Sequence, residues 1–323
     1  MKAFGILSAF AAICINASAM AQSYPTRPIT IVVPFAAGGP VDTTTRIVAE
    51  KMKDSLGQTI IVENVGGAAG GLAAARVAKS APDGYTLMTG IWGTHVANGA
   101  IYRLTYNLQT DFEPVALLSS NPLLIVSSKA VPAKTLQELV AWLKKDPDKA
   151  TQGTSGIGSV GHVAGVFFQK LTGTKFSFVP YRGLAPAMQD LNAGTIDLMF
   201  DTPATSLPHI QAGNIRAYAV TSPTRIASAP DIPTVDEAGL KDLYISTWTG
   251  FFAPKGTSKE VVAKLEAAAR DALADPEVQK KLAGVGQDVY PPDQRSSAAL
   301  AKLQDDDIKK WWPIIKDANI RAE

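Results

Sequence analysis

The hydrophobic positions of this chain form short β-branched runs that alternate with longer amphipathic stretches. Residues 29–34 read ITIVVP, a run typical of a buried parallel strand, and residues 41–56 follow with helical spacing. Further strands are expected at 59–63 and 85–89, with a helix at 72–79 between them. Short strands that alternate with helices predict an α/β doubly wound domain.

A second alternation starts in the middle of the chain. Residues 112–128 contain two apolar strands around Asn121-Pro122, and residues 136–145 form an amphipathic stretch. The elements expected after them are a helix through Phe167 and Leu171, strands at 176–179, 196–200 and 215–220, and helices at 186–192 and 203–211. This pattern predicts a second α/β domain.

The C-terminal part of the chain is strongly helical. Helices are expected at 259–274, 276–282 and 294–318. By analogy with two-domain α/β folds, we expect this tail to pack on the first domain. Two strands, near 124–126 and 248–252, would then cross between the domains. Two crossing strands form a hinge, and hinge closure around a ligand is an established mode of two-domain receptors.

Length supports the same division, because about 300 residues exceed what one hydrophobic core usually organises. The expected fold class is α/β, with two doubly wound domains joined by a two-strand hinge. Lobe 1 would comprise residues 22–124 and 249–323, lobe 2 residues 125–248, and a ligand cleft would lie between the lobes.

The first residues have the pattern of a secretory signal peptide. Lys2 precedes an apolar run that ends at Ile15, and Ala19-x-Ala21 is a small-x-small cleavage pattern. We therefore expect residues 1–21 to be removed. The run is too short for a membrane span, and the polar, proline-containing stretch 22–28 argues against a buried N-terminal helix. Cleavage would remove Cys14, the one cysteine, and with it disulfides, thiolate metal sites and cysteine nucleophiles.

Charge limits the possible partners. The formal net charge is +2 and no basic block or tail occurs, which argues against nucleic acid and against an anionic membrane surface as partner. No later apolar run is long enough to span a bilayer, so we expect no direct insertion into a membrane.

A glycine pair follows the first predicted strand. Gly38 and Gly39 bend the backbone before a helix, whose unpaired first-turn amides would face the crevice at the strand ends and could bind an anion. Asp42 is either a ligand contact or a partner of the helix dipole. A second candidate loop, 89–95, follows another strand and offers Gly93 and Thr94 ahead of His95, since a lone histidine is more often structural.

A third loop, 154–162, is rich in serine and glycine. Gly156, Gly158 and Gly161 formally match the dinucleotide fingerprint G-x-G-x-x-G. That fingerprint needs an acidic residue about 20 positions later, and none occurs between Gly161 and Gln189. The loop fits better as a set of hydroxyls and amides that face a carboxylate at the start of a helix.

A fourth segment, 179–186, also connects a strand to a helix. Its Arg182 could form a two-pronged pair with a carboxylate or could be a surface arginine, and the sequence leaves both open. Asp201, after the strand at 196–200, completes this set.

Catalytic and metal-binding patterns are missing. Ser155 and Ser159 lack the flanking glycines of G-x-S-x-G, and the three histidines have no paired ligand spacing. We expect no catalytic residue, no metal and no cofactor. An exported serine hydrolase that uses Ser155 or Ser159 with His162 is the enzymatic alternative.

Several motifs occur together in one order along the chain. They are Tyr24-Pro25-x-Arg27-Pro28-Ile29, Val33-Pro34-Phe35-x-Ala37-Gly38-Gly39-x-x-Asp42, Val62-Glu63-Asn64-x-x-Gly67, Ala81-Pro82-Asp83-Gly84-Tyr85-Thr86-Leu87, Asp111-Phe112-x-Pro114-Val115, Val179-Pro180-Tyr181-x-Gly183 and Pro233-Thr234-x-x-Glu237-Ala238-Gly239. In this combination the chain closely resembles the Bug-type receptors, the substrate-binding components of tripartite tricarboxylate transporters.

The resemblance implies a two-lobed type II periplasmic-binding-protein fold, a periplasmic location, a monomeric receptor and a two-protein membrane transporter as partner. It implies a small carboxylate ligand: a dicarboxylate, a tricarboxylate or an aromatic acid. The ligand-binding positions that it points to are Phe35, Ala37, Gly38, Gly39, Asp42, Thr94, Ser155, Gly158, Ser159, His162, Gly183 and Asp201, to which the loop pattern adds Gly93 and Arg182.

Two departures from the family pattern bear on selectivity. Pro40-Val41 stands where many relatives carry small polar residues, and Arg182 stands where relatives often carry lysine. Trp92, Trp248 and Phe35 could form an aromatic-acid pocket or could be hinge and core residues, so the ligand stays open. A receptor that feeds a signalling protein would use the same closure as a transport receptor, and the sequence does not separate the two.

Overall fold

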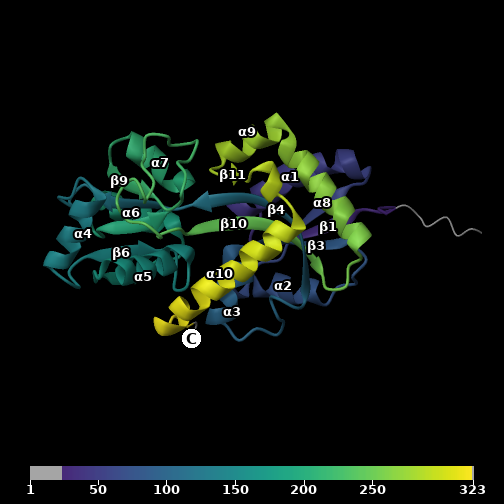
Figure 1. Ribbon diagram of the computed structural model, residues 1–323, viewed down its shortest axis with the longest axis horizontal. Helices are drawn as coiled ribbons and strands as arrows, with labels where there is room; N and C mark the ends of the chain where they lie inside the picture. Colours follow the sequence, from purple (N-terminus) through teal and green to yellow (C-terminus); the bar gives the residue numbers. More distant parts are fainter. Residues whose placement is uncertain (1–23, 322–323) are drawn as a thin grey trace, which may run out of the picture.

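Two β-sheets with their flanking helices make up the protein (Figure 1). A computed structural model describes residues 24–321; the predicted signal peptide, 1–21, and its Cys14 lie outside that range. One sheet has six strands and the other five, and each is covered by helices. We call the six-stranded sheet and its helices lobe 1 and the five-stranded sheet and its helices lobe 2. The predicted α/β fold with two lobes is confirmed.

The sheet of lobe 1 is assembled from both ends of the chain. Its strand order is β11-β4-β10-β3-β1-β2. These strands are β1 (Ile29–Val33), β2 (Ile60–Asn64), β3 (Thr86–Ile91), β4 (Phe112–Pro122), β10 (Ser246–Pro254) and β11 (Asp288–Val289). The first three run parallel, and β10 pairs antiparallel with both β3 and β4. The late strand β10 therefore lies in the middle of this sheet.

Helices cover both faces of the lobe 1 sheet. One face carries α1 (Pro40–Leu56), α8 (Lys259–Ala274) and α9 (Pro276–Gly284). The other carries α2 (Gly71–Ala78), α3 (Asn98–Ile101) and α10 (Ser297–Asp317). Successive strand residues point to opposite faces, so Ile31 lies in the α1–α8 core while Val32 lies in the core of the other face. Hydrophobic runs buried on both faces explain why these strands lack polar alternation.

Lobe 2 is continuous in sequence. Its strand order is β7-β6-β8-β5-β9. These strands are β5 (Leu124–Ser128), β6 (Thr151–Thr154), β7 (Ser177–Pro180), β8 (Leu198–Asp201) and β9 (Ile215–Val220). The helices that cover the sheet are α4 (Leu136–Lys145), α5 (Val160–Thr172), α6 (Leu184–Ala193) and α7 (Pro203–Gln211). Short helical turns complete the chain at η1 (Ala68–Gly70), η2 (Gly93–Ala97) and η3 (Pro292–Gln294).

The chain crosses between the lobes twice, and the crossings lie side by side. The first is at Leu123, between β4 and β5, and the second lies just before β10. Thr221 joins them, because its hydroxyl oxygen accepts from the Leu123 amide at 2.9 Å and donates to the Ile245 carbonyl at 2.6 Å. The sequence placed residues 246–248 in lobe 2, but they pair with β4 in the sheet of lobe 1. Strand pairing therefore puts the second crossing a few residues earlier than expected.

Candidate ligand-binding site

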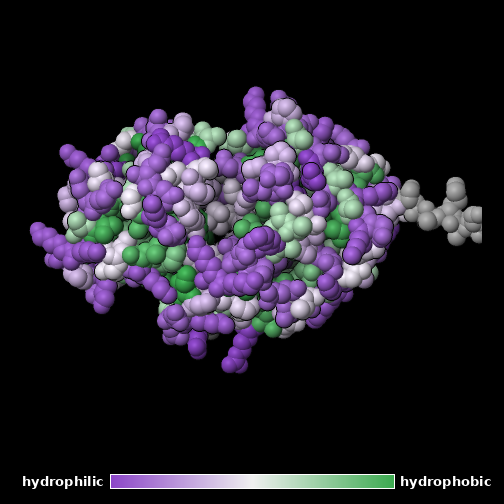
Figure 2. All heavy atoms as spheres, viewed as in Figure 1, coloured by the Kyte–Doolittle hydropathy of each residue, from purple (hydrophilic) through white to green (hydrophobic). Residues whose placement is uncertain are grey.

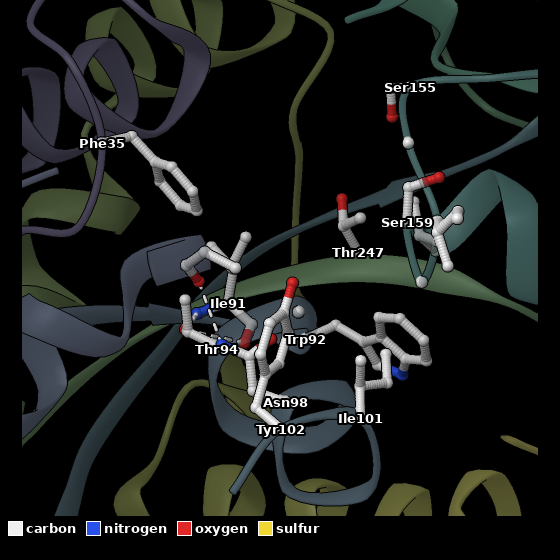
Figure 3. A pocket seen from close by; sticks show the side chains of 16 residues that line it. Phe35, Ile91, Trp92, Thr94, Asn98, Ile101, Tyr102, Ser155, Ser159 and Thr247 are labelled. Carbon is white, nitrogen blue, oxygen red and sulfur yellow. Dashed lines mark hydrogen bonds between the residues drawn. The ribbon is translucent and has the colours of Figure 1, made fainter. Parts of the chain in front are cut away.

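A cavity of about 390 Å³ lies between the two lobes (Figure 3). Lobe 1 contributes Phe35, Ala69, Ile91, Trp92, Gly93, Thr94, Asn98, Ile101, Tyr102 and Thr247. Lobe 2 contributes Ser155, Gly156, Ile157, Gly158, Ser159 and Val160. Six predicted positions, namely Phe35, Gly93, Thr94, Ser155, Gly158 and Ser159, are thus brought together from loops far apart in sequence.

One wall of the cavity is built on a π-helical turn. The turn η2 follows β3 and continues into α3, so that Thr94, Asn98, Ile101 and Tyr102 face the cavity together. π-turns of this kind occur frequently at functional sites. The Thr94 hydroxyl oxygen accepts from the Ile91 amide at 3.0 Å, and the Asn98 side-chain amide donates to the Ala69 carbonyl at 3.0 Å. Both side chains are thereby fixed to the backbone of lobe 1.

His95, next to Thr94, belongs to the core. It is fully buried and stacks on Phe252 with ring centroids 3.9 Å apart. Burial lowers its pKa to about 3, so the imidazole is neutral at physiological pH. The sequence argument that ranked Gly93 and Thr94 above His95 agrees with this placement.

The opposite wall is the loop before α5, together with the first turn of that helix. Ser159 caps the helix, its hydroxyl oxygen accepting from the His162 amide at 3.4 Å. Gly156 and Gly158 have φ values of +130° and +76°, conformations that favour glycine. Because the N-terminus of a helix presents unpaired amides and a positive dipole end, this wall can bind an anion without a charged side chain.

His162 holds the same loop from behind. Its Nδ1 accepts a hydrogen bond from the Gly158 amide at 2.9 Å, and burial lowers its pKa. The ring packs edge-on against Phe178 and does not line the cavity. The hydrolase alternative needs a side-chain bond between serine and histidine. Here the Ser159 hydroxyl instead accepts from the His162 backbone amide, while Nδ1 is occupied by Gly158.

Asp42 anchors the loop after β1 and does not line the cavity, so its role as a ligand contact stays a prediction. Its carboxylate accepts from the Gly38 amide at 2.8 Å, from Arg46 at 3.0 Å and from Asn64 at 2.9 Å. Burial alone would raise its pKa, but these hydrogen bonds outweigh burial and lower it. The Gly38 amide is consequently occupied, and Pro40 has no N–H, so neither of these two residues offers an amide to an anion at the start of α1. Ala37, Gly38 and Gly39 likewise lie outside the cavity lining.

The remaining predicted positions also lie away from the cavity lining. Arg182 is exposed, and Gly183 precedes α6 with φ of +115°. Asp201 is fully buried at the end of β8, where one carboxylate oxygen accepts from the Ser206 hydroxyl at 2.6 Å and the other has no partner. Burial raises its pKa to about 6, against the opposing effect of the Ser206 hydroxyl and the nearby Thr202 backbone. None of these three residues lines the cavity, and their role in ligand binding stays a prediction.

The two walls touch at Gly158 and Ile101. A Cβ atom placed on Gly158 would lie 2.6 Å from Cδ1 of Ile101, so the glycine backbone is in direct contact with the opposite lobe. A larger residue at position 158 would require the end of the Ile101 side chain to move. The structure therefore shows the cleft with its walls in contact.

The cavity is polar but uncharged. None of the lining residues in the described chain is lysine, arginine, histidine, aspartate or glutamate. The groups available to a ligand are backbone amides, hydroxyls, the Asn98 amide and aromatic faces. Within residues 24–321 no three His, Cys, Asp or Glu side chains gather as metal ligands, and no helix is long and apolar enough to cross a membrane.

A second cavity, of about 620 Å³, lies on the other side of the hinge strands. It is lined by the 221–227 loop of lobe 2 and by Asp288, Asp307 and Lys310 of lobe 1. Ser246 lines this rear cavity while its neighbour Thr247 lines the ligand cavity, because successive residues of β10 point to opposite faces. Figure 2 shows the surface hollowed between the two lobes, beside α10.

Sequence reasoning missed most of the lobe 1 wall. Asn98, Ile101, Tyr102 and Thr247 line the cavity but were not predicted. Residues 94, 98, 101 and 102 have the spacing of one helical face. This pattern, starting from the predicted Thr94, could have identified Asn98, Ile101 and Tyr102. Of the aromatic residues left open, Phe35 and Trp92 line the cavity, while Trp248 lies in the core and donates to Asp307 at 2.8 Å.

Two α/β lobes that are joined by two adjacent crossings and enclose a polar, uncharged cavity define a two-lobed solute-binding protein. The profile of the family described as "Tripartite tricarboxylate transporter family receptor" matches residues 44–320, and the chain belongs to this family. Receptors of this family are periplasmic solute-binding proteins. The predicted resemblance to Bug-type receptors is confirmed.

Individual relatives cover nearly the whole chain. The UPF0065 protein in the TAR-I ttuE-ttuC' intergenic region of Agrobacterium vitis is 42% identical over 92% of this chain and 86% of its own length. Protein BugT of Bordetella pertussis is 31% identical over 100% of this chain and 98% of its own.

Solved structures agree with this assignment. MatC of Rhodopseudomonas palustris with bound malate is 40% identical, with a TM-score of 0.76 over 90% of this chain and 100% of that one. Rpa4515 of R. palustris with adipate is 32% identical, with a TM-score of 0.78 over 93% of this chain and 100% of that one.

Proposed function

We propose that this protein is a periplasmic receptor that binds a small carboxylate and delivers it to a membrane transporter of the tripartite tricarboxylate type. The observation that carries the proposal is the uncharged cavity at the N-terminus of α5, faced by the hydroxyl and aromatic wall of lobe 1. Such a wall stabilises an anion through amides and a helix dipole. Family membership and the malate and adipate in two structural neighbours support the same class of ligand.

Binding and closure are coupled in this proposal. A carboxylate at the loop 155–160 would contact lobe 2, and the body of the same molecule would contact the wall formed by η2 and α3. A ligand favours the closed form only through contacts that it gains there. The contact between Gly158 and Ile101 brings the two walls within reach of one small molecule. Each chain encloses a cavity with residues from both of its own lobes, which supports a receptor that works as a monomer.

The predicted site residues divide into two groups in this proposal. Phe35, Gly93, Thr94, Ser155, Gly158 and Ser159 contact the ligand, since all six line the cavity. Asp42 and His162 do not contact the ligand but position loops beside the cavity: Asp42 the loop after β1, and His162 the loop before α5. Strand pairing favours a lobe 2 that runs from Leu124 to Ile245, with lobe 1 on either side of it in sequence.

The test is a calorimetric and thermal-shift screen of the protein without residues 1–21. The probes are adipate, succinate, malate and citrate, with the diamides of adipic and succinic acid as uncharged controls. A ligand of the native state raises its melting temperature by mass action. We expect stabilisation by one or more acids and none by the diamides. Equal stabilisation by acid and diamide, or binding of none of the acids by protein that was unfolded and refolded to remove carried-over ligand, would refute a carboxylate receptor.

A further inference from the structure

Tyr102 presents a free hydroxyl group to the ligand cavity. It follows α3 directly, and its backbone amide donates to the Asn98 carbonyl at 2.9 Å, which fixes the position of its Cα. In Figure 3 the ring stands between Asn98 and Thr247, with the hydroxyl pointing into the cavity. Within residues 24–321 this hydroxyl forms no hydrogen bond, although the side chain is half-buried.

The hydroxyl and amide side chains beside Tyr102 on the same wall already form hydrogen bonds. The Thr94 hydroxyl exchanges hydrogen bonds with the backbone of Ile91, and the Asn98 amide donates to Ala69. The Thr247 hydroxyl donates to the Asn121 carbonyl at 3.4 Å. Two donors on the lobe 1 wall therefore have no partner within residues 24–321: the Tyr102 hydroxyl and the indole N–H of Trp92, which is fully buried. Of the two, the Tyr102 hydroxyl points into the cavity, where a bound molecule can accept from it.

The surroundings of Tyr102 are largely apolar, so leaving its hydroxyl proton without an acceptor would be unfavourable when a ligand is bound. Its neighbours on the wall include the apolar side chains of Ile91, Trp92 and Ile101, and the opposite wall is in contact with Ile101. A ligand with a plain alkyl chain would fill this region and shield the hydroxyl from water without pairing it. A buried donor without a partner is unfavourable, whereas a donor paired with a carboxylate or carbonyl oxygen is favourable.

We propose that Tyr102 determines specificity by donating a hydrogen bond to a second polar group of the bound acid. This inference rests on the proposed carboxylate-receptor function and narrows it. The ligand carries one carboxylate, held by the loop before α5, and a second oxygen acceptor several atoms away, held by Tyr102. The receptor thus selects bifunctional acids over monocarboxylates of the same length.

The experiment uses matched acids that differ at one end. The six-carbon set is adipate, its mono-amide and hexanoate; the four-carbon set is succinate, its mono-amide and butyrate. Calorimetry gives Kd for wild type, Tyr102→Phe and Tyr106→Phe. Tyr106 is the matched control, because its hydroxyl is also unpaired but is buried outside the cavity lining. Thermal melts establish that each variant is folded.

In the set that fits the cavity, wild type should bind the diacid and the mono-amide more tightly than the monoacid. Tyr102→Phe should weaken the first two by roughly 10-fold, the value of one hydrogen bond to an ionised or strongly polar acceptor, and change the monoacid by less than about 2-fold. Tyr106→Phe should leave all three unchanged.

Three results would overturn the role of Tyr102 while leaving the receptor function intact. They are equal weakening of all three acids by Tyr102→Phe, no weakening of any, and a mono-amide that binds wild type no better than the monoacid. If wild type binds no acid of either set or of the wider screen, the receptor proposal falls and takes this inference with it.

Discussion

Buried polar residues around the cleft serve mainly to hold its loops. Asp42 ties the loop after β1 to α1 and β2, and His162 ties the loop before α5. Asp201 is the exception, because one of its carboxylate oxygens is buried without a partner. Burial of a carboxylate is unfavourable, so the pKa of Asp201 is raised in the folded protein.

Asp201 should make the protein less stable as pH rises. Its folded-state pKa of about 6 lies above the unfolded value near 3.9, so between these values the folded state binds more protons. The free energy of unfolding should therefore fall by about 2–3 kcal/mol between pH 4 and pH 7 because of this group, and no further at higher pH. Asp201→Asn cannot ionise and should escape this loss.

Urea unfolding at pH 4 and pH 8 tests this expectation. Relative to wild type, Asp201→Asn should gain more stability at pH 8 than at pH 4, whereas Asp293→Asn, at an exposed position, should show no such difference. A gap between Asp201→Asn and wild type that is the same at both pH values would contradict the assignment.

At the scale of elements, the cleft depends on how the loop before α5 meets α3. Gly158 combines a φ of +76° with direct contact to Ile101. The first property sets the path of the loop, and the second sets how closely the lobes approach. Substitution of this one residue therefore affects both.

Gly158→Ala should hold the lobes apart and weaken ligand binding. A Cβ atom 2.6 Å from Ile101 Cδ1 requires the end of the Ile101 side chain or the loop itself to move, so we expect a rise in Kd of up to roughly 10-fold for the acid that binds best in the screen. The matched control is Gly173→Ala, at the end of α5, where φ is +65° and nothing lies within 4 Å of the added atom. It carries similar backbone strain, about 1–2 kcal/mol, without the contact between lobes.

A second substitution separates contact from strain. If the clash is the cause, Ile101→Ala should recover part of the affinity in the Gly158→Ala background, although it removes a cavity-lining side chain. Equal Kd values for Gly158→Ala and Gly173→Ala would show that approach of the lobes at this point does not limit binding.

Most elements could be predicted because their sequence patterns are local. The strand Ile215–Val220 and the helices Leu136–Lys145, Pro203–Gln211 and Lys259–Ala274 agree with the predicted ranges. The short strands β6 and β11 were missed, since two to four residues with few apolar side chains give no periodic signal. Strand β6 reads TQGT and is held by its neighbours β7 and β8.

The site was predicted less completely, because it depends on contacts between distant segments. Glycine and serine loops after strands gave six lining positions. The sequence could not show that Asp42 and Asn64, 22 residues apart, would pair and turn the carboxylate away from the cleft. Thr247 could not be predicted for a similar reason. It lines the cavity because β10 returns to the sheet of lobe 1 at this point, and that depends on pairing with the distant strand β4.

At the scale of the whole molecule, lobe 2 is a single insertion between two neighbouring strands of lobe 1. All five strands of its sheet lie between Leu124 and Val220, and a hydrophobic cluster around Leu191 and Met199 lies entirely within it. Lobe 1 instead needs both ends of the chain, since β10 and α10 complete the core that β3 begins.

A fragment of residues 123–245 should therefore fold by itself, whereas residues 24–122 should not. The first contains a complete sheet and its helices, although it exposes the surface of Phe167 that packs on Trp311 in the full chain. Circular dichroism and urea titration should show a cooperative transition for the fragment 123–245, at lower urea than for the whole protein. A cooperative transition in the fragment 24–122, or none in 123–245, would contradict this division.

The central position of β10 also has a consequence in time. The strands β1, β3 and β4 are made first, but the strand that joins β3 to β4 is made only after all of lobe 2. A chain that emerges from its N-terminus can complete lobe 2 while the earlier segment still lacks its partner, because domains fold as units once their residues are present. More than a hundred residues separate β4 from β10, so the sheet of lobe 1 cannot be completed until lobe 2 has been made. This protein is proposed to be exported across a membrane. We expect the delay to keep the segment from β1 to β4 incompletely folded until export has begun.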